Sequence, residues 1–148
     1  GNAGAIVRAA EAFGATGVIF VKGTVNAWHP KTLRASAGSL FRVPVIVGLD
    51  AALTRAALQQ HRLDIYAAVP FSGSQRLAEE IDLGRRCALI VGSEGRGVSN
   101  ELRSVAEDLA IATAGVESLN AAVAASILLY ESRRQRVRAA TLNGVPRN

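Results

Sequence analysis

Three groups of polar residues interrupt an otherwise apolar sequence, and they are the candidates for chemistry. Asn2 and Arg8 stand near the start of the chain, the segment Gly-Ser-Glu-Gly-Arg-Gly occupies residues 92–97, and Ser-Leu-Asn occupies residues 118–120. A guanidinium group donates several hydrogen bonds to phosphate or ribose oxygens. Glycines let a backbone approach a ligand closely, and the start of a helix offers free N–H groups to an anion. These residue types therefore suit the binding of an anionic ligand such as a phosphate or a carboxylate.

Each group also has an ordinary structural explanation. An exposed tight turn accounts for residues 92–97, whose spacing matches neither the dinucleotide-binding fingerprint nor the phosphate-binding P-loop. Ser118 is explained as a helix N-cap, and Arg8 as a surface arginine. Glu94 is either a solvated acid or a partner of Arg8 or of a substrate group. The residues alone leave these alternatives open.

The elements that must position these residues follow from the pattern of apolar runs. Short apolar runs alternate with helix-like stretches, which predicts an α/β fold with a mostly parallel sheet covered by helices on both faces. Asp50, Ser99 and Ser118 are the expected N-caps. Ligands of open parallel sheets bind beyond the carboxyl ends of the strands, and residues 92–97 directly follow an expected strand. We expect strands at residues 17–21, 43–47, 65–69, 87–91 and 109–112, and helices at residues 5–13, 51–61, 99–106 and 118–138.

Composition narrows the classes of partner and compartment. The 148-residue chain carries a net charge of +5 and has a pI of about 10.3, which is compatible with a polyanionic partner. Its few aromatic residues are not interleaved with Lys and Arg as on a base-stacking surface. We therefore expect phosphate contacts and shape to contribute more than stacking to the binding of any nucleic acid.

The residues present do not support a membrane-spanning, secreted, disulfide-bonded or metal-binding protein. No apolar run reaches the ~20 residues of a membrane span, and no secretory signal is present in these residues. The single cysteine, Cys87, excludes an internal disulfide framework and suits the reducing cytoplasm. His29 and His61 have no ligand spacing around them, so we expect no metal site.

Taken in order, the three polar groups resemble the three sequence motifs of the SpoU (TrmH-like) family of RNA ribose 2′-O-methyltransferases, within the SPOUT superfamily. Residues 2–14 resemble the first motif, residues 89–99 the second and residues 111–130 the third. Residues 36–45 resemble the family's segment between its first and second strands. One departure is that the family often has Ile-Pro-Met where this chain has Ile-Ala-Thr at residues 111–113.

This resemblance implies a fold, a cofactor and partners. The fold would be α/β with a deep trefoil knot at the C-terminal side. Residues 1–140 would form the catalytic domain, without the family's first strand and any upstream RNA-binding domain, and residues 141–148 would form a frayed tail. The protein would bind S-adenosylmethionine in the knot, form a homodimer, act on rRNA or tRNA in the cytoplasm, and have no contact with a membrane.

The resemblance also assigns the site residues. The catalytic and ribose-positioning set would be Asn2, Arg8, Glu94, Ser118 and Asn120. The cofactor pocket would be lined by Gly92, Glu94, Gly95, Ile111, Thr113, Leu119 and Asn120. A guanidinium stays protonated up to pH ~12, so we expect Arg8 to orient the ribose or phosphate and stabilise an alkoxide rather than act as a base. The alternative function is an inactive RNA-binding module that kept the fold but binds no cofactor.

Overall fold

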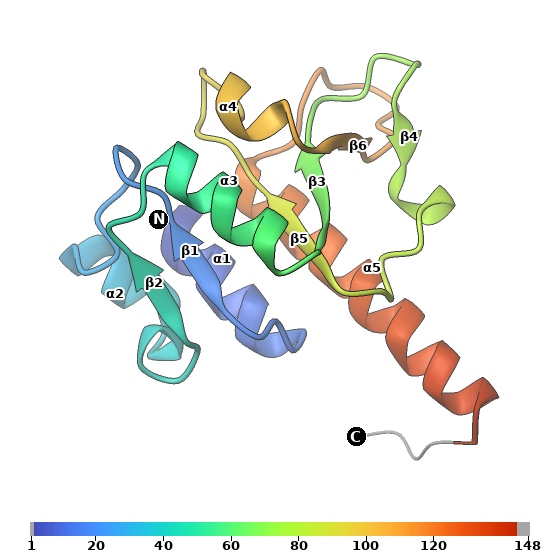
Figure 1. Ribbon diagram of the computed structural model, residues 1–148, viewed down its shortest axis with the longest axis horizontal. Helices are drawn as coiled ribbons and strands as arrows, with labels where there is room; N and C mark the ends of the chain where they lie inside the picture. The colour runs from blue at the N-terminus through green and yellow to red at the C-terminus, as the bar shows by residue number, and fades with distance from the viewer. Residues whose placement is uncertain (1, 145–148) are drawn as a thin grey trace.

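A computed structural model describes residues 2–144 and shows parallel strands flanked by helices (Figure 1). Every ladder in this range is parallel, as predicted. The strands form two sheets rather than one, with the orders β1-β2 and β4-β6-β3-β5. The strands are β1 (Val18–Phe20), β2 (Val45–Val47), β3 (Asp64–Ala68), β4 (Arg76–Leu77), β5 (Cys87–Ile90) and β6 (Glu107–Ala110). The helices are α1 (Asn2–Ala12), α2 (Pro30–Ser36), α3 (Ala51–Gln60), α4 (Asn100–Arg103) and α5 (Ala121–Leu142), with short 3-10 helices at Ser39–Phe41 and Ala78–Glu80.

Two apolar cores hold these layers together. Strand β3 lies between β5 and β6, and its residues Ile65–Ala67 are buried, as expected for a central parallel strand. The larger core joins this sheet to α5, whose Leu128 is buried against Leu109 and Leu83. The smaller core lies between α1 and the β1-β2 sheet. Figure 1 shows α5 as a long helix crossing behind the larger sheet.

The expected strands are confirmed to within one or two residues, but two elements were missed. Strand β4 has only two residues, too few for a periodic pattern. Helix α2 has seven residues and starts with a proline, a residue favoured at the first helical position. The side chain of His29 caps this helix by accepting a hydrogen bond from the N–H of Lys31 at 3.1 Å.

Several helix boundaries differ from the prediction. Helix α1 begins at Asn2 rather than after it, and α4 is limited to four residues. Asp50 and Ser99 are N-caps, as expected. Helix α5 begins three residues later than expected and runs to Leu142, two residues into the segment expected to fray; residues 145–148 of that segment lie outside the described residues.

Helices α1 and α2 are in direct backbone contact at Gly4. A Cβ atom at this position would lie 2.3 Å from the carbonyl oxygen of Thr32 and 2.7 Å from the Cβ of Ala35. These distances are far below van der Waals contact, so only glycine allows the two helices to approach this closely. The start of α1, where Asn2 lies, is therefore placed against α2.

Across residues 2–144, no helix is both long enough and apolar enough to span a membrane.

Candidate functional site

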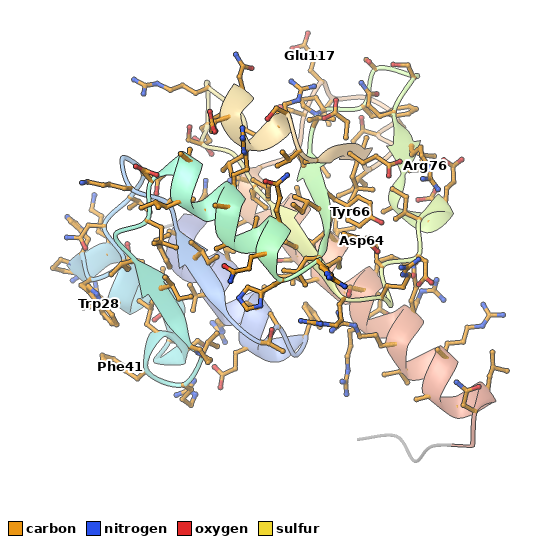
Figure 2. All side chains as sticks on the ribbon, viewed as in Figure 1. Trp28, Phe41, Asp64, Tyr66, Arg76 and Glu117 are labelled. Atoms are coloured by element: carbon orange, nitrogen blue, oxygen red, sulfur yellow. The ribbon has the colours of Figure 1, made fainter. Side chains whose placement is uncertain are left out.

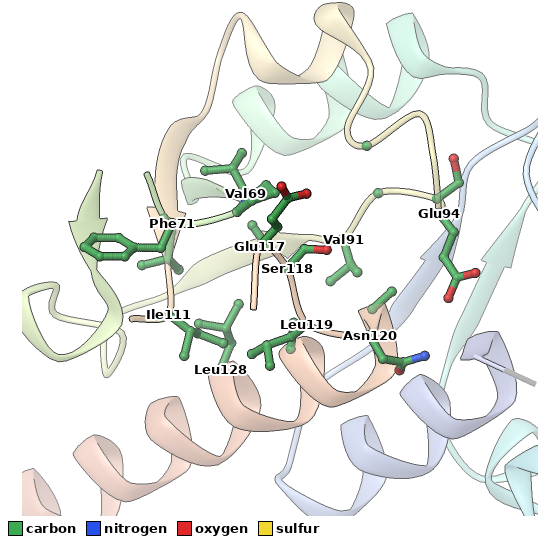
Figure 3. Close-up of a pocket in the computed structure, with 18 of the residues that line it drawn as sticks. Val69, Phe71, Val91, Glu94, Ile111, Glu117, Ser118, Leu119, Asn120 and Leu128 are labelled. Atoms are coloured by element: carbon green, nitrogen blue, oxygen red, sulfur yellow. The ribbon is translucent and has the colours of Figure 1, made fainter. Parts of the chain in front are cut away.

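A pocket of about 550 Å³ opens beyond the carboxyl ends of β3, β5 and β6 (Figure 3). Residues 68–71 after β3 and residues 91–97 after β5 form part of its lining, and the chain after β6 and the first turns of α5 complete it. The volume falls within the ~300–1,000 Å³ typical of small-molecule sites. The position at the strand ends is the one that the sequence predicted for a ligand.

The glycine-rich segment 92–97 folds back on itself at the mouth of this pocket. The N–H of Gly97 donates to the carbonyl oxygen of Ser93 at 2.9 Å, and Gly95 and Gly97 have positive φ angles of 83° and 67°. At Gly92 a Cβ atom would lie 2.1 Å from the carbonyl carbon of Gly97. The segment is thus a tight turn and also part of the pocket wall, so the two interpretations of these glycines are compatible.

A hydrogen-bonded network joins the three polar groups at one end of the pocket. Asn2 Nδ2 donates to Glu94 Oε1 at 2.9 Å, and Asn120 Nδ2 donates to Asn2 Oδ1 at 3.1 Å. Asn120 Oδ1 in turn accepts from the backbone N–H groups of Ala122 and Val123 at 2.9 and 3.2 Å. One chain therefore brings together residues that are 118 positions apart in the sequence.

This network corrects the expected start of α5. The N-cap is Asn120 and not Ser118, which is exposed and lines the pocket two residues earlier. Asparagine is among the best N-cap residues, which explains a residue of low helix propensity at this position. Because the Asn120 side chain occupies two N–H groups of the first turn, the helix start offers fewer free donors to an anion than expected.

Arg8 lies apart from the network. It is exposed on α1, six residues beyond Asn2. In an α-helix this separation corresponds to ~9 Å along the axis and ~120° around it. The sequence left open whether Glu94 is solvated or holds Arg8 or a substrate group, and the structure shows a bond to Asn2. Arg8 is also not among the residues that line the pocket.

The residues predicted to contact a cofactor all lie on the lining of the pocket. Figure 3 shows the apolar side chains of Ile111, Leu119 and Leu128 together on one side, with Asn120 and Glu94 nearer α1. The seven predicted residues on the lining are Gly92, Glu94, Gly95, Ile111, Thr113, Leu119 and Asn120. Their contacts with a cofactor remain a prediction.

Sequence reasoning missed the contribution of the chain after β3. Val69 and Phe71 line the pocket beside Ile111, and Glu117 adds a carboxylate to its lining (Figure 3). Residues 69–71 follow a predicted strand of the same sheet, so strand-end geometry was the available signal. Glu117 directly precedes the third polar group.

The remaining candidate groups lie outside the pocket lining. Cys87 is partly buried against the larger core, and burial raises the pKa of its thiol. In the part of the chain that the structure describes, no three His, Cys, Asp or Glu side chains are arranged to hold a metal ion.

Comparison with known proteins defines the class to which this fold and site belong. Residues 1–130 match the model of the SpoU rRNA Methylase family, and the chain belongs to this family. It is 40% identical over 139 residues to an uncharacterised tRNA/rRNA methyltransferase of Synechocystis, covering 91% of this chain and 35% of that protein. It is 37% identical over 136 residues to the 23S rRNA (guanosine(2553)-2′-O)-methyltransferase RlmP of Bacillus subtilis, covering 90% of this chain and 53% of that protein.

The fold is also shared with solved structures of the family. The SpoU methyltransferase AviRb of Streptomyces viridochromogenes, solved in complex with the cofactor AdoMet, superposes with a TM-score of 0.85 at 30% identity. The match covers 93% of this chain and 56% of AviRb. The chain thus spans about half the length, or less, of the curated relatives described above.

Proposed function

We propose that this protein catalyses the transfer of a methyl group from S-adenosylmethionine to a ribose 2′-hydroxyl of RNA, either rRNA or tRNA. The observation that carries the proposal is the Asn2–Glu94–Asn120 network at one end of the strand-end pocket, in a chain of the SpoU family. A relative is named as a 23S rRNA 2′-O-methyltransferase, and a similar structure holds AdoMet.

The pocket has the properties that this cofactor requires. Its apolar side, with Ile111, Leu119 and Leu128, suits the flat adenine ring. The carboxylates of Glu94 and Glu117 on the same lining suit a ligand that carries a positive sulfur. When bound, S-adenosylmethionine supplies an electrophilic methyl group on that sulfur.

The residues of the chain would position the ribose and manage its proton. Asn2 is fixed by Glu94 on one side and Asn120 on the other, so its amide is pre-oriented toward a ligand group. Ser118, exposed on the lining, would hydrogen-bond the 2′-hydroxyl and orient it. The guanidinium of Arg8 would stabilise the alkoxide that develops as the hydroxyl passes its proton to solvent water.

Arg8 reaches such a site most simply from a second copy of the chain, so the proposal includes a homodimer. Arg8 is exposed, lies ~120° around α1 from Asn2, and is not among the residues that line the pocket. On α5, Val123, Ile127 and Tyr130 are 47%, 39% and 54% exposed. Their spacing of four and three residues places them on one helix face, and this apolar stripe is the proposed contact between copies.

Mixing two inactive variants tests the shared site. Arg8→Ala and Asn120→Ala chains, each inactive alone, would form hybrid dimers in which one site has both residues intact. Random mixing should restore about a quarter of wild-type turnover, because about half of the dimers are hybrids with one intact site each. Mixing without any recovery would place Arg8 and Asn120 in the same chain's site and overturn this arrangement.

The proposal extends to two features of the fold. We propose that the C-terminal part forms the trefoil knot. Residues 91–97 and the chain leading into α5 line one pocket, which supports this proposal.

We also propose that one more parallel strand, from residues preceding Gly1 in a longer form, pairs with β1 and β5. Within residues 2–144, β1 pairs only with β2 and β5 only with β3, and Figure 1 shows β1 and β5 running in the same direction.

An unpaired strand edge leaves backbone groups open to pairing, which supports the added strand. Hydrogen exchange checks it: amides of β1 and β5 should gain protection in a chain extended upstream. An upstream RNA-binding domain and a cytoplasmic location complete the proposal.

Calorimetric titration with S-adenosylmethionine tests the function directly. Saturable binding of one cofactor per chain, abolished by Leu119→Glu in the pocket, is the expected result. A folded protein that binds RNA but no S-adenosylmethionine would instead be the inactive RNA-binding module, and the methyltransferase proposal would fail.

A further inference from the structure

Trp28 and Phe41 form an exposed aromatic pair beside the β1-β2 sheet, outside the pocket described above. Trp28 is 47% and Phe41 76% exposed, and their ring centroids lie 6.3 Å apart with a tilt of 35°. In Figure 2 both side chains lie at the outer edge of the molecule, by α2 and the neighbouring 3-10 helix. Two large aromatic side chains left together in water have apolar area to bury against a partner.

The segment of the chain that carries this pair is cationic and contains no acid. Residues 12–49 include Lys22, Lys31, Arg34 and Arg42 but no Asp or Glu. Arg42 is paired with Glu11 at 2.6 Å. The side chains of Lys22, Lys31 and Arg34 make no ion pair with any residue in the range 2–144. Three uncompensated cations therefore remain around the rings.

One of these cations shares a hollow with Trp28, and the other two lie on the helix that follows Trp28 in the chain. Lys22 and Trp28 line the same hollow of about 240 Å³ at the carboxyl ends of β1 and β2, smaller than the ~300–1,000 Å³ of typical ligand pockets. On α2, Thr32 is buried, whereas Lys31 and Arg34 are exposed and share one outward face at the i, i+3 spacing.

We propose that this surface, made of Lys22, Trp28, Lys31, Arg34 and Phe41 and called here the Trp28 surface, binds single-stranded RNA. A base stacks on the exposed indole, and the cations contact flanking phosphates. Aromatic faces with adjacent Lys and Arg are the general means by which proteins hold single strands. The inference rests on the proposed function in taking RNA as the polymer.

Charge favours RNA over a second copy of this chain as the occupant. In a two-fold contact the same patch meets itself, so the uncompensated cations of one copy would face those of the other. Like charges brought together in this way oppose association. A polyanion neutralises them instead and releases its counterions, which adds to the affinity.

The surface is also fixed relative to the candidate active site. Gly4 lets the backbone of α2 pack directly against the first turn of α1, and Asn2 in that turn belongs to the polar network. RNA bound to α2 would therefore be held in a fixed position relative to Asn2. The sequence predicted little stacking because its aromatic residues are few and not interleaved with Lys and Arg. Trp28 and Phe41 are 13 positions apart, and the fold brings their rings together.

Intrinsic fluorescence tests the inference, because Trp28 is the only tryptophan in the chain. Titration with a single-stranded RNA oligonucleotide should quench its emission, whereas heparin, a polyanion without bases, should bind without quenching. Trp28→Ala should weaken RNA binding by about 5- to 100-fold, and Trp28→Phe should retain most of the affinity. Arg34→Ala should lower the salt dependence by about one counterion, and Arg138→Ala, an exposed cation at the far end of α5, serves as the charge-matched control.

Two outcomes would overturn the inference. RNA binding that leaves the Trp28 emission and the Trp28→Ala affinity unchanged would place the RNA elsewhere. A shift from dimer to monomer in light scattering of Trp28→Ala, without a change in RNA affinity, would identify a contact between copies. The fluorescence readout requires neither cofactor nor methyl transfer, so quenching in a protein that fails to bind S-adenosylmethionine would retain the RNA surface while rejecting the methyltransferase.

Discussion

The substitution Gly92→Ala should damage the candidate cofactor pocket more than it damages the fold. The added Cβ would lie 2.1 Å from the carbonyl carbon of Gly97 and 2.4 Å from the N of Val98, both backbone atoms. Carbon atoms in contact are ~3.5 Å apart or more, so the turn must move by roughly 1.4 Å, the difference between these values. Overpacking of this kind costs about 1–3 kcal/mol. Residues 93–97 are exposed, so the turn can shift outward without unfolding the core.

The displaced turn carries Glu94, whose carboxylate holds Asn2 at 2.9 Å. Loss of this hydrogen bond and of the local pocket wall should weaken S-adenosylmethionine binding about tenfold or more, measured by calorimetric titration. The free energy of unfolding in urea should fall by about 1–3 kcal/mol.

Gly115→Ala is the matched control for this experiment. A Cβ added at Gly115 would meet no atom within 4 Å, and the residue has no positive φ. Its substitution should therefore change the free energy of unfolding by less than ~0.5 kcal/mol. Wild-type cofactor affinity in Gly92→Ala would refute the argument that the close approach at this glycine shapes the pocket.

Three further predictions concern the elements around the site. Arg8→Ala should nearly abolish methyl transfer, measured with radiolabelled cofactor, while calorimetry shows cofactor affinity largely unchanged; near-normal turnover would remove Arg8 from the mechanism. Gly4→Ala should gain ~1 kcal/mol of helix propensity but lose about 1–3 kcal/mol to the contact 2.3 Å from the Thr32 oxygen, so urea unfolding should show net destabilisation. The hydrogen bond from Arg134 is the main cause that lowers the pKa of the Glu131 carboxyl below 4.5. The ionised carboxylate therefore contributes to the free energy of unfolding above that pH. The stability advantage of wild type over Glu131→Gln should therefore disappear as the pH falls through the lowered pKa, and an advantage that persists in acid would contradict this assignment.

Local pattern was sufficient for most strands and for two of the N-caps. Apolar runs bounded by turn residues located β1, β2, β3, β5 and β6. A buried strand needs several consecutive apolar residues, and such a run can be recognised in the sequence. Short elements such as β4 and α2 escaped, since two or seven residues carry too little periodicity. The start of α5 was misplaced because Ser118 and Asn120 are both good N-caps. In the structure the Asn120 side chain accepts from the N–H groups of Ala122 and Val123, which identifies Asn120 as the cap.

The composition of the site was accessible from the motifs, but its internal geometry was not. Glycines and polar residues at strand ends indicated where a ligand would lie. No spacing rule predicts that Glu94 bonds Asn2 rather than Arg8, because that choice depends on how α1 packs against the rest of the fold. The same limit hid the aromatic pair, because Trp28 lies in the turn before α2 and Phe41 in the 3-10 helix that follows α2.

The hydrogen bond between Asn2 and Asn120 also bears on the order in which the protein acquires its properties. It links the first described helix to the last, across a separation of 118 residues. Contacts so distant in sequence form late, because closing a long loop costs entropy that only later contacts repay. During synthesis, the chain must extend past Asn120 before this bond can form. Only molecules in which Asn2 has reached Asn120 would then bind a ligand at the pocket. The affinity for the cofactor would therefore report whether folding is complete.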